Sequence, residues 1–194
     1  MNSRKSSPVL KLALMGTTAI VLAGCDTEPR QDGKLYQTPN QCEMDGTFTD
    51  SQCYESYQAA VAQHEETAPK YNSETLCTDQ HGRNTCYPVQ RNSGSFWSPF
   101  LTGYFVSSAI QRVTGNTRSD WDYYVRPIYR NRHDSKALYT ATGEPIRQSA
   151  SGSWGVRADA MQTTPKAATK VQTRSTVVAR GGFGSRFSGR SFGG

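Results

Sequence analysis

Apolar residues recur at helical spacing after Asp50. The face of a helix with about 3.6 residues per turn would carry Cys53, Tyr57, Ala60, Val61 and His64. Asp50 or Ser51 can cap this helix, and Pro69 ends it. The pattern predicts a helix that runs to about Thr67, with His64 at the edge of its buried face.

Residues 92–111 carry no charge, and residues 96–105 are the most apolar stretch after residue 25. Ser98 followed by Pro99 is typical of a helix start, so an apolar helix is expected within residues 92–113. This helix either lies on a bilayer with Trp97 and Tyr104 at headgroup depth, or packs on residues 35–91 and completes their core. The second interpretation is favoured because residues 35–91 hold few large apolar side chains.

The N-terminal segment combines positive charge with a short apolar run. Three basic residues, Arg4, Lys5 and Lys11, precede or open an uncharged run over residues 12–23, which is too short to span a bilayer as a stable helix. The run ends in Leu22-Ala23-Gly24-Cys25, the pattern of a lipobox. Residues 1–24 are therefore expected to be a signal peptide, and Cys25 the lipidated N-terminus that anchors the protein in a bilayer.

The residue after Cys25 bears on which membrane is used. In enteric bacteria an Asp at this position, here Asp26, typically withholds a lipoprotein from transport to the outer membrane. A lipid-anchored protein that faces the periplasm is expected, with the inner membrane favoured over the outer membrane.

Four further cysteines are expected to form two disulfides, because exported thiols oxidise. Cys42 and Cys53 bracket ten residues and Cys77 and Cys86 bracket eight, a spacing that favours local pairing. The alternative is a zinc site that combines His64 and His81 with Cys77 and Cys86. Disulfides are favoured, and no metal or cofactor is expected.

An internal repeat surrounds these cysteines. Tyr36 precedes Cys42 by six residues and Tyr71 precedes Cys77 by six, an offset of 35 residues. Each copy continues with a helix-start signal, Thr38-Pro39 or Asn72-Ser73, and a later glycine, Gly46 or Gly82. The repeat predicts two disulfide-stapled loops within a lobe of residues 35–91, which is too small to be stable without such staples.

The charge is divided between the two halves of the chain. Residues 26–91 hold five basic and eleven acidic side chains, whereas residues 92–194 hold fourteen basic and five acidic ones. In residues 114–147 arginines alternate with aromatic side chains, a composition that favours nucleic acid in a cytoplasmic protein. Export argues against nucleic acid and leaves anionic lipid, cell-wall polymer or an ordinary solvated surface. Residues 127–129 and 137–140 can pair as a short β-hairpin.

The last segment, residues 148–194, holds seven basic side chains and Asp159 as its one acid. Rich in Gly, Ser and Thr, it is expected to be disordered alone. Phe183, Phe187 and Phe192 lie among its arginines as a short linear binding segment. The tail is expected to bind anionic lipid or cell-wall polymer as a tether separable from the lobe.

Six short motifs spread along the chain resemble, in the same order, motifs of the YgiB-like family of enterobacterial proteins. They are Leu35-Tyr36, Thr67-Ala68-Pro69-Lys70-Tyr71, Ser93-Gly94-Ser95-Phe96-Trp97, Gly103-Tyr104, Tyr139 with Thr142-Gly143, and Arg180-Gly181-Gly182-Phe183-Gly184. The resemblance implies an exported protein with disulfides and supplies no reaction, since that family is uncharacterised and is often encoded beside an ATP-grasp protein similar to glutathionylspermidine synthase. Residues 112–136 depart from it, being basic and aromatic where relatives are rich in Gly and Gln.

The sequence contains no zincin motif, Walker loop, thioredoxin motif or dinucleotide fingerprint. We therefore expect a non-catalytic envelope lipoprotein, an interaction or scaffold protein that has an envelope protein as a further candidate partner. The alternative is a periplasmic protein that binds a small molecule or a metal through the lobe and His64. The expected fold is α-rich: a small disulfide-stapled helical lobe with a short β-hairpin and long disordered regions. Its expected segments are 1–24 signal peptide, 25–34 lipidated linker, 35–91 lobe, 92–113 apolar helix, 114–147 basic and aromatic segment, and 148–194 tail.

Overall fold

The computed structural model describes residues 30–179 apart from residues 93, 114–116, 150–151 and 163–169. Its strands are β1 Arg30–Tyr36, β2 Cys86–Arg91, β3 Gly94–Pro99, β4 Gly103–Ser107, β5 Val125–Asn131, β6 Asp134–Thr140, β7 Pro145–Gln148 and β8 Trp154–Arg157. Its helices are α1 Pro39–Asp45, α2 Asp50–Thr67, α3 Glu74–His81, α4 Arg118–Tyr124, α5 Ala158–Gln162 and α6 Arg174–Ala179, with a 3-10 turn, η1, at Ser108–Arg112.

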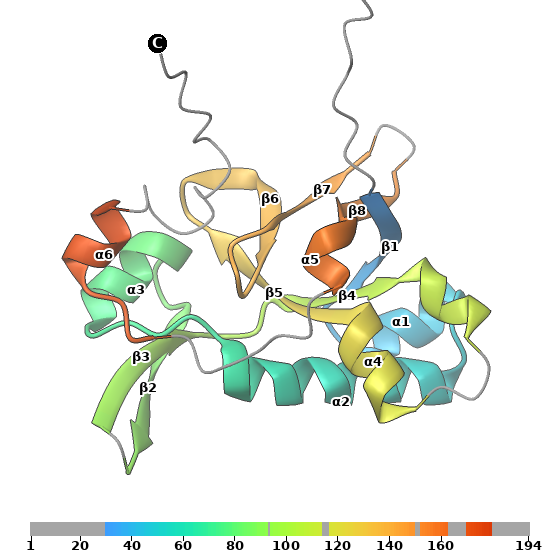
Figure 1. Cartoon of the computed structure of the whole chain (residues 1–194), viewed down its shortest axis with the longest axis horizontal. Helices are drawn as coiled ribbons and strands as arrows, with labels where there is room; N and C mark the ends of the chain where they lie inside the picture. Colours follow the sequence, from blue (N-terminus) through green and yellow to red (C-terminus); the bar gives the residue numbers. More distant parts are fainter. Residues whose placement is uncertain (1–29, 93, 114–116, 150–151, 163–169, 180–194) are drawn as a thin grey trace, which may run out of the picture.

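The centre of the molecule is a closed barrel of six antiparallel strands in the order β1-β4-β5-β6-β7-β8 (Figure 1). Strand β8 closes it by pairing with β1, with Val156 opposite Gln31. The expectation of an α-rich fold is therefore wrong. The helices lie around the barrel, and β2 and β3 form a separate two-stranded hairpin.

The apolar helix expected within residues 92–113 is also wrong, because most of this segment forms β3, β4 and η1. All five residues of β4 are buried, since β4 lies between β1 and β5 in the barrel wall and α2 packs nearby. A strand buried on both faces reads as a continuous apolar run, and such a run does not distinguish a strand from a buried helix. The segment was expected either to lie on a bilayer or to pack in the core. Tyr104 lies in the core.

Glycines at two places allow the barrel strands to approach closely. A Cβ atom added to Gly33 would collide with the backbone of Val106 on β4, and one added to Gly103 would collide with the carbonyl of Tyr36 on β1. Strands β1 and β4 pair between these points, with Leu35 opposite Phe105. These glycines therefore permit the pairing on which the barrel depends.

The hairpin expected from residues 127–129 and 137–140 is confirmed as part of β5 and β6. Ile128 pairs with Thr140, and Tyr129 pairs with Tyr139. Trp121, Tyr129 and Tyr139 are buried, so these aromatic side chains belong to the core. They do not form an exposed platform between the arginines of residues 114–147.

The helix predicted after Asp50 is confirmed as α2, and its N-cap is Thr49, one residue before the expected cap. The repeat is reproduced in α1 and α3, which begin after the capping side chains of Thr38 and Ser73 and are followed by Gly46 and Gly82. The copies diverge afterwards, because Cys53 lies inside α2 whereas Cys86 opens β2. The local pairing expected for the cysteines is observed, with disulfides Cys42–Cys53 and Cys77–Cys86.

The expected division into lobe and tail does not match the barrel. Strand β1 belongs to the acidic half and pairs with β4 and β8 of the basic half. Val156 and Met161, both expected in the disordered tail, are fully buried with Phe105, Ile128 and Ile146. The tail prediction is therefore wrong for residues 152–162, because these residues close the barrel and supply part of its core.

Candidate functional site

A cavity of about 290 Å³ lies between the end of α2 and the β2–β3 hairpin. His64, Glu65 and Ala68 line it from the helix side, together with Lys70 in the loop that follows. The hairpin side consists of Tyr87, Val89, Arg91, Phe96 and Ser98. This combination of aromatic, charged and hydroxyl groups is suited to a small ligand.

The hairpin presents this set because side chains alternate along a strand. Tyr87, Val89 and Arg91 stand two residues apart on β2, and Ser98 and Phe96 lie opposite Tyr87 and Val89 on β3. Cys86, before Tyr87, and Trp97, between Phe96 and Ser98, pack instead with Tyr71, Leu76, Cys77 and Val177. One face of the hairpin therefore lines the cavity, and the other is fixed to α3 and α6.

His64 joins this cavity to the barrel. Its Nδ1 lies 2.9 Å from the hydroxyl of Tyr129, and its Nε2 lies 3.0 Å from the hydroxyl of Tyr87. Burial lowers the pKa of His64 and raises the pKa of Tyr129 well above its ordinary value. Both groups are therefore neutral near pH 7. When Tyr129 donates to Nδ1, Nε2 donates to Tyr87, and the Tyr87 hydroxyl is also hydrogen-bonded to Ser98.

The cavity has two cations in its lining, Lys70 and Arg91. Lys70 Nζ lies 5.2 Å from the centre of the Phe96 ring. Burial and the nearby charge of Arg91 both lower the pKa of Lys70. Among the described residues, neither cation forms an ion pair with an acidic side chain.

A second histidine, His81, is 3% exposed and belongs to the core behind the hairpin. Its Nδ1 lies 2.7 Å from the carbonyl oxygen of Arg130, which requires Nδ1 to carry a proton and donate. The hydroxyl of Tyr71 then donates to Nε2 over 2.8 Å. Burial lowers the pKa of His81 to about 4. These contacts fix its tautomer and hold α3 against β5.

The zinc site considered from the sequence is not assembled. Cys77 and Cys86 are bonded to each other, and the rings of His64 and His81 are hydrogen-bonded to tyrosine hydroxyls. Within the described part of the chain, no group of three or more His, Cys, Asp or Glu side chains is placed to hold a metal ion.

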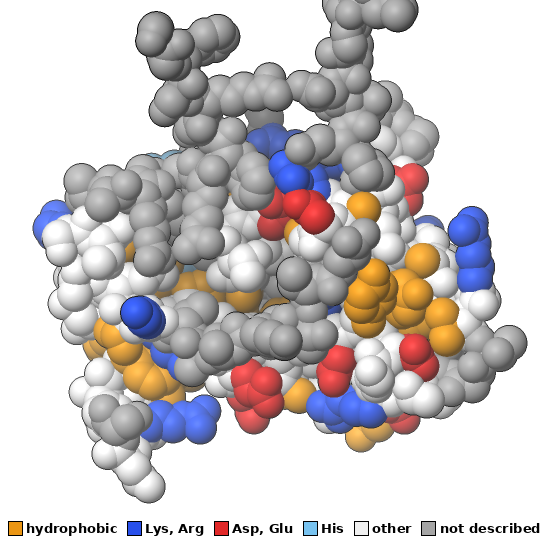
Figure 2. All heavy atoms as spheres, viewed as in Figure 1, with side chains coloured by type: hydrophobic (Ala, Val, Ile, Leu, Met, Phe, Trp, Pro, Cys, Tyr) orange, Lys and Arg blue, Asp and Glu red, His pale blue; other side chains and the backbone are white. Residues whose placement is uncertain are grey.

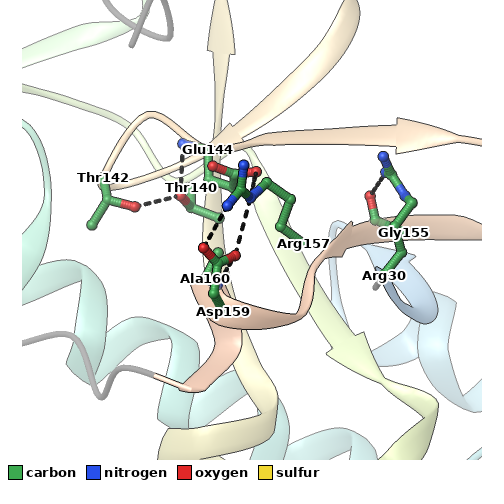
Figure 3. Close-up of polar contacts among 8 residues, drawn as sticks. All are labelled: Arg30, Thr140, Thr142, Glu144, Gly155, Arg157, Asp159 and Ala160. Carbon is green, nitrogen blue, oxygen red and sulfur yellow. Dashed lines mark hydrogen bonds and ion pairs between the residues drawn. The ribbon is translucent and has the colours of Figure 1, made fainter. Parts of the chain in front are cut away.

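A separate polar cluster lies where the barrel closes (Figure 3). Arg157 on β8 donates to both carboxylate oxygens of Asp159, over 3.0 and 2.6 Å, and its Nε lies 3.7 Å from Glu144 Oε1. Bonding by Arg157 lowers the pKa of Asp159. The amide of Glu144 donates to Thr140 Oγ1 over 3.1 Å. The cluster joins the β6–β7 turn to β8 and α5.

Cys25 and the three phenylalanines of the tail lie outside the described residues. No helix in the described ranges is long and apolar enough to cross a bilayer. Of the residues singled out from the sequence, His64 lines the cavity, and Cys86 belongs to the hairpin that forms one wall of it.

Comparison with known proteins shows to which family the chain belongs. Residues 30–194 match the family described as proteins of unknown function, DUF1190. The chain belongs to the DUF1190 family. UPF0441 proteins of Klebsiella pneumoniae subsp. pneumoniae and of Klebsiella pneumoniae strain 342 are each 28% identical to this DUF1190 protein over 208 residues, which cover 98% of this chain and 85% of the relative. No solved structure matches it. The family is itself uncharacterised, so the match supplies no activity.

Most of the cavity was missed by sequence reasoning about the DUF1190 chain. The alternation of Tyr87, Val89 and Arg91 is the pattern of one strand face and was available as a signal. The proximity of Lys70 to Phe96 depends on the bridge between Tyr71 and Trp97, a long-range pairing that no local pattern indicates.

Proposed function

We propose that this DUF1190 protein is a lipoprotein of the bacterial cell envelope, anchored by acyl chains on Cys25 and acting as a non-catalytic interaction or scaffold protein. The observation that carries the proposal is Leu22-Ala23-Gly24-Cys25 at the end of an uncharged run that follows basic residues. The likeness of its motifs to the YgiB-like family points in the same direction.

The position of the barrel is compatible with a membrane anchor. Strand β1 begins at Arg30, and the five residue steps from Cys25 to Arg30 span at most about 18 Å when fully extended. An acylated Cys25 would therefore hold the start of β1 close to the headgroups. The two disulfides suit an oxidising compartment such as the periplasm. Asp26 favours the inner membrane.

A non-catalytic role is supported by the state of the buried polar groups. Both ring nitrogens of His64 and of His81 are engaged by neighbouring groups, and Arg157 is engaged by carboxylates. These contacts explain the buried positions of His64, His81 and Arg157 by their part in holding the fold together. The exposed Lys170 and Arg174, with the basic residues at 180, 186 and 190, are proposed to add attraction to anionic lipid or cell-wall polymer.

The anchor is tested in an enteric host by membrane fractionation and by incorporation of radiolabelled palmitate. The wild-type protein should remain in the membrane fraction after a high-salt wash and incorporate label, because acyl chains are held by hydrophobic burial that salt does not screen. The Cys25→Ser variant should incorporate no palmitate. The matched control is Cys42→Ser, which removes a disulfide cysteine and should still be labelled. Label retained by Cys25→Ser would end the proposal.

A further inference from the structure

The cavity beside the β2–β3 hairpin carries a small surplus of positive charge. Lys70 and Arg91 contribute two cations and Glu65 one carboxylate, while burial lowers the pKa of His64 and keeps it neutral near pH 7. The charged lining is therefore positive by one unit. An occupant with a single negative charge leaves the cavity neutral, whereas a doubly charged phosphate leaves one uncompensated negative charge beside Glu65.

The same cavity offers apolar surface for the rest of a ligand. The ring of Phe96 lies beside Lys70, and Val89 stands opposite Phe96 across the hairpin. The Tyr87 ring is stacked on Phe100 with a centroid distance of 4.8 Å, which limits its movement. A volume of about 290 Å³ lies at the lower end of the range for ligand pockets, so the occupant is small.

We propose that this cavity binds a small organic monocarboxylate, with the carboxylate between Lys70 and Arg91 and the apolar body against Phe96 and Val89. The Tyr87 hydroxyl is engaged by His64 and Ser98, so the contacts to the carboxylate come from the two cations. Charge-assisted hydrogen bonds from Lys and Arg to a carboxylate are the strong ones in such a site.

The site is distant from the start of β1. The hairpin and the start of β1 lie on opposite sides of the barrel (Figure 1). Basic and hydrophobic side chains occur together over the hairpin region of the surface (Figure 2). A ligand dissolved in the surrounding medium can therefore reach this end of the molecule while the start of β1 is held near a membrane. The inference goes beyond the proposed anchoring role and does not depend on it.

The test uses the full chain in detergent and follows amide shifts in ¹H–¹⁵N spectra during titration with three probes. The probes are benzoate, neutral benzyl alcohol, and phenyl phosphate, which is mostly a dianion at about pH 7.5. Benzoate should shift amides of residues around the cavity and bind about tenfold more tightly than benzyl alcohol. Phenyl phosphate should bind more weakly than benzoate.

Three variants test which charged side chains determine the affinity for benzoate. Arg91→Gln should weaken benzoate binding about tenfold through loss of a charge-assisted bond. The control Arg83→Gln removes an exposed arginine of the neighbouring loop that is not part of the cavity lining, and should leave binding unchanged. Glu65→Gln should strengthen benzoate binding and reduce the preference for benzoate over phenyl phosphate.

Four results would overturn the inference. Equal affinity for benzoate and benzyl alcohol would show that the cavity does not recognise the negative charge. Phenyl phosphate binding more tightly than benzoate would show that the ligand is not a monocarboxylate. Equal losses in Arg91→Gln and Arg83→Gln would indicate attraction by overall charge. Absence of shifts around the cavity with all three probes would show that no such site exists.

Discussion

At the scale of single residues, the main surprise is a pair of neutral histidines in the core. His81 is held by the Arg130 carbonyl and the Tyr71 hydroxyl, and His64 connects two tyrosines. The sequence placed His64 on the edge of a buried face, which is correct. The tyrosine partners come from β2, β5 and the loop before α3, so the spacing within one helix could not identify them.

His81 should make the protein less stable as the pH falls. Its pKa is lowered to about 4 in the fold, whereas an unfolded histidine has a pKa near 6.5. The unfolded chain therefore binds more protons between these values, and its population grows as the pH falls. The stabilising contribution is complete above about pH 6.5, falls by at most about 1.4 kcal/mol per pH unit, and is lost by about pH 4, a total of about 3 kcal/mol.

Urea unfolding at several pH values between 7.5 and 4.5 measures this dependence. The variant His81→Asn has an amide nitrogen that can replace the Nδ1 donor and does not titrate, so its dependence should be smaller, with a remainder from His64, whose pKa is also lowered. The pKa of His81 is measured directly from its imidazole ¹⁵N shifts in the wild type. A value near 6.5 would contradict this account.

At the scale of elements, local sequence signals predicted helix starts and one hairpin correctly, but the sequence did not predict the pairing of strands far apart in the chain. The caps at Thr38 and Ser73 mark helices that the repeat predicted, and residues 127–140 contain the predicted hairpin. Strand β4 was mistaken for a helix because it is buried throughout. Strand β8 was missed because Trp154–Arg157 is a short segment whose partner, β1, lies more than 100 residues earlier. The cavity was not predicted because it depends on the long-range bridge between Tyr71 and Trp97.

Each disulfide joins two neighbouring elements of the fold. Cys77 and Cys86 connect α3 to β2 across 9 residues of separation, and Cys42 and Cys53 connect α1 to α2 across 11. Replacing Cys77 and Cys86 together by Ala should lower the free energy of unfolding by roughly 2 to 3 kcal/mol in the chain-entropy model. Urea unfolding measures this loss. Peptide mapping without reduction should recover each local pair, and a Cys42–Cys77 peptide would contradict the structure.

At the scale of the whole molecule, the opposite charges of the two halves are combined within one barrel. Strand β1 of the acidic half is held between β4 and β8 of the basic half. The tail therefore cannot be removed from residue 148 onward as a separable tether.

Truncation after Gln148 should abolish cooperative thermal unfolding. It removes β8, leaves unpaired edges on β1 and β7, and takes Val156 and Met161 from the core cluster of Phe105, Ile128 and Ile146. A chain that ends at Ala179 keeps every described element and serves as the control, with a Tm close to that of the full chain. If the shorter chain melts cooperatively at the same temperature, β8 does not close the barrel.

The central claim is that Cys25 becomes the lipidated N-terminus of an envelope protein, and mass spectrometry of the N-terminal peptide from membrane-purified protein tests it most directly. The account predicts a peptide that begins at Cys25 and carries the mass of two or three acyl chains, because a single chain anchors only marginally. A peptide in which Leu22-Ala23-Gly24 is still joined to Cys25, or one that begins at an unmodified Cys25, would contradict the claim.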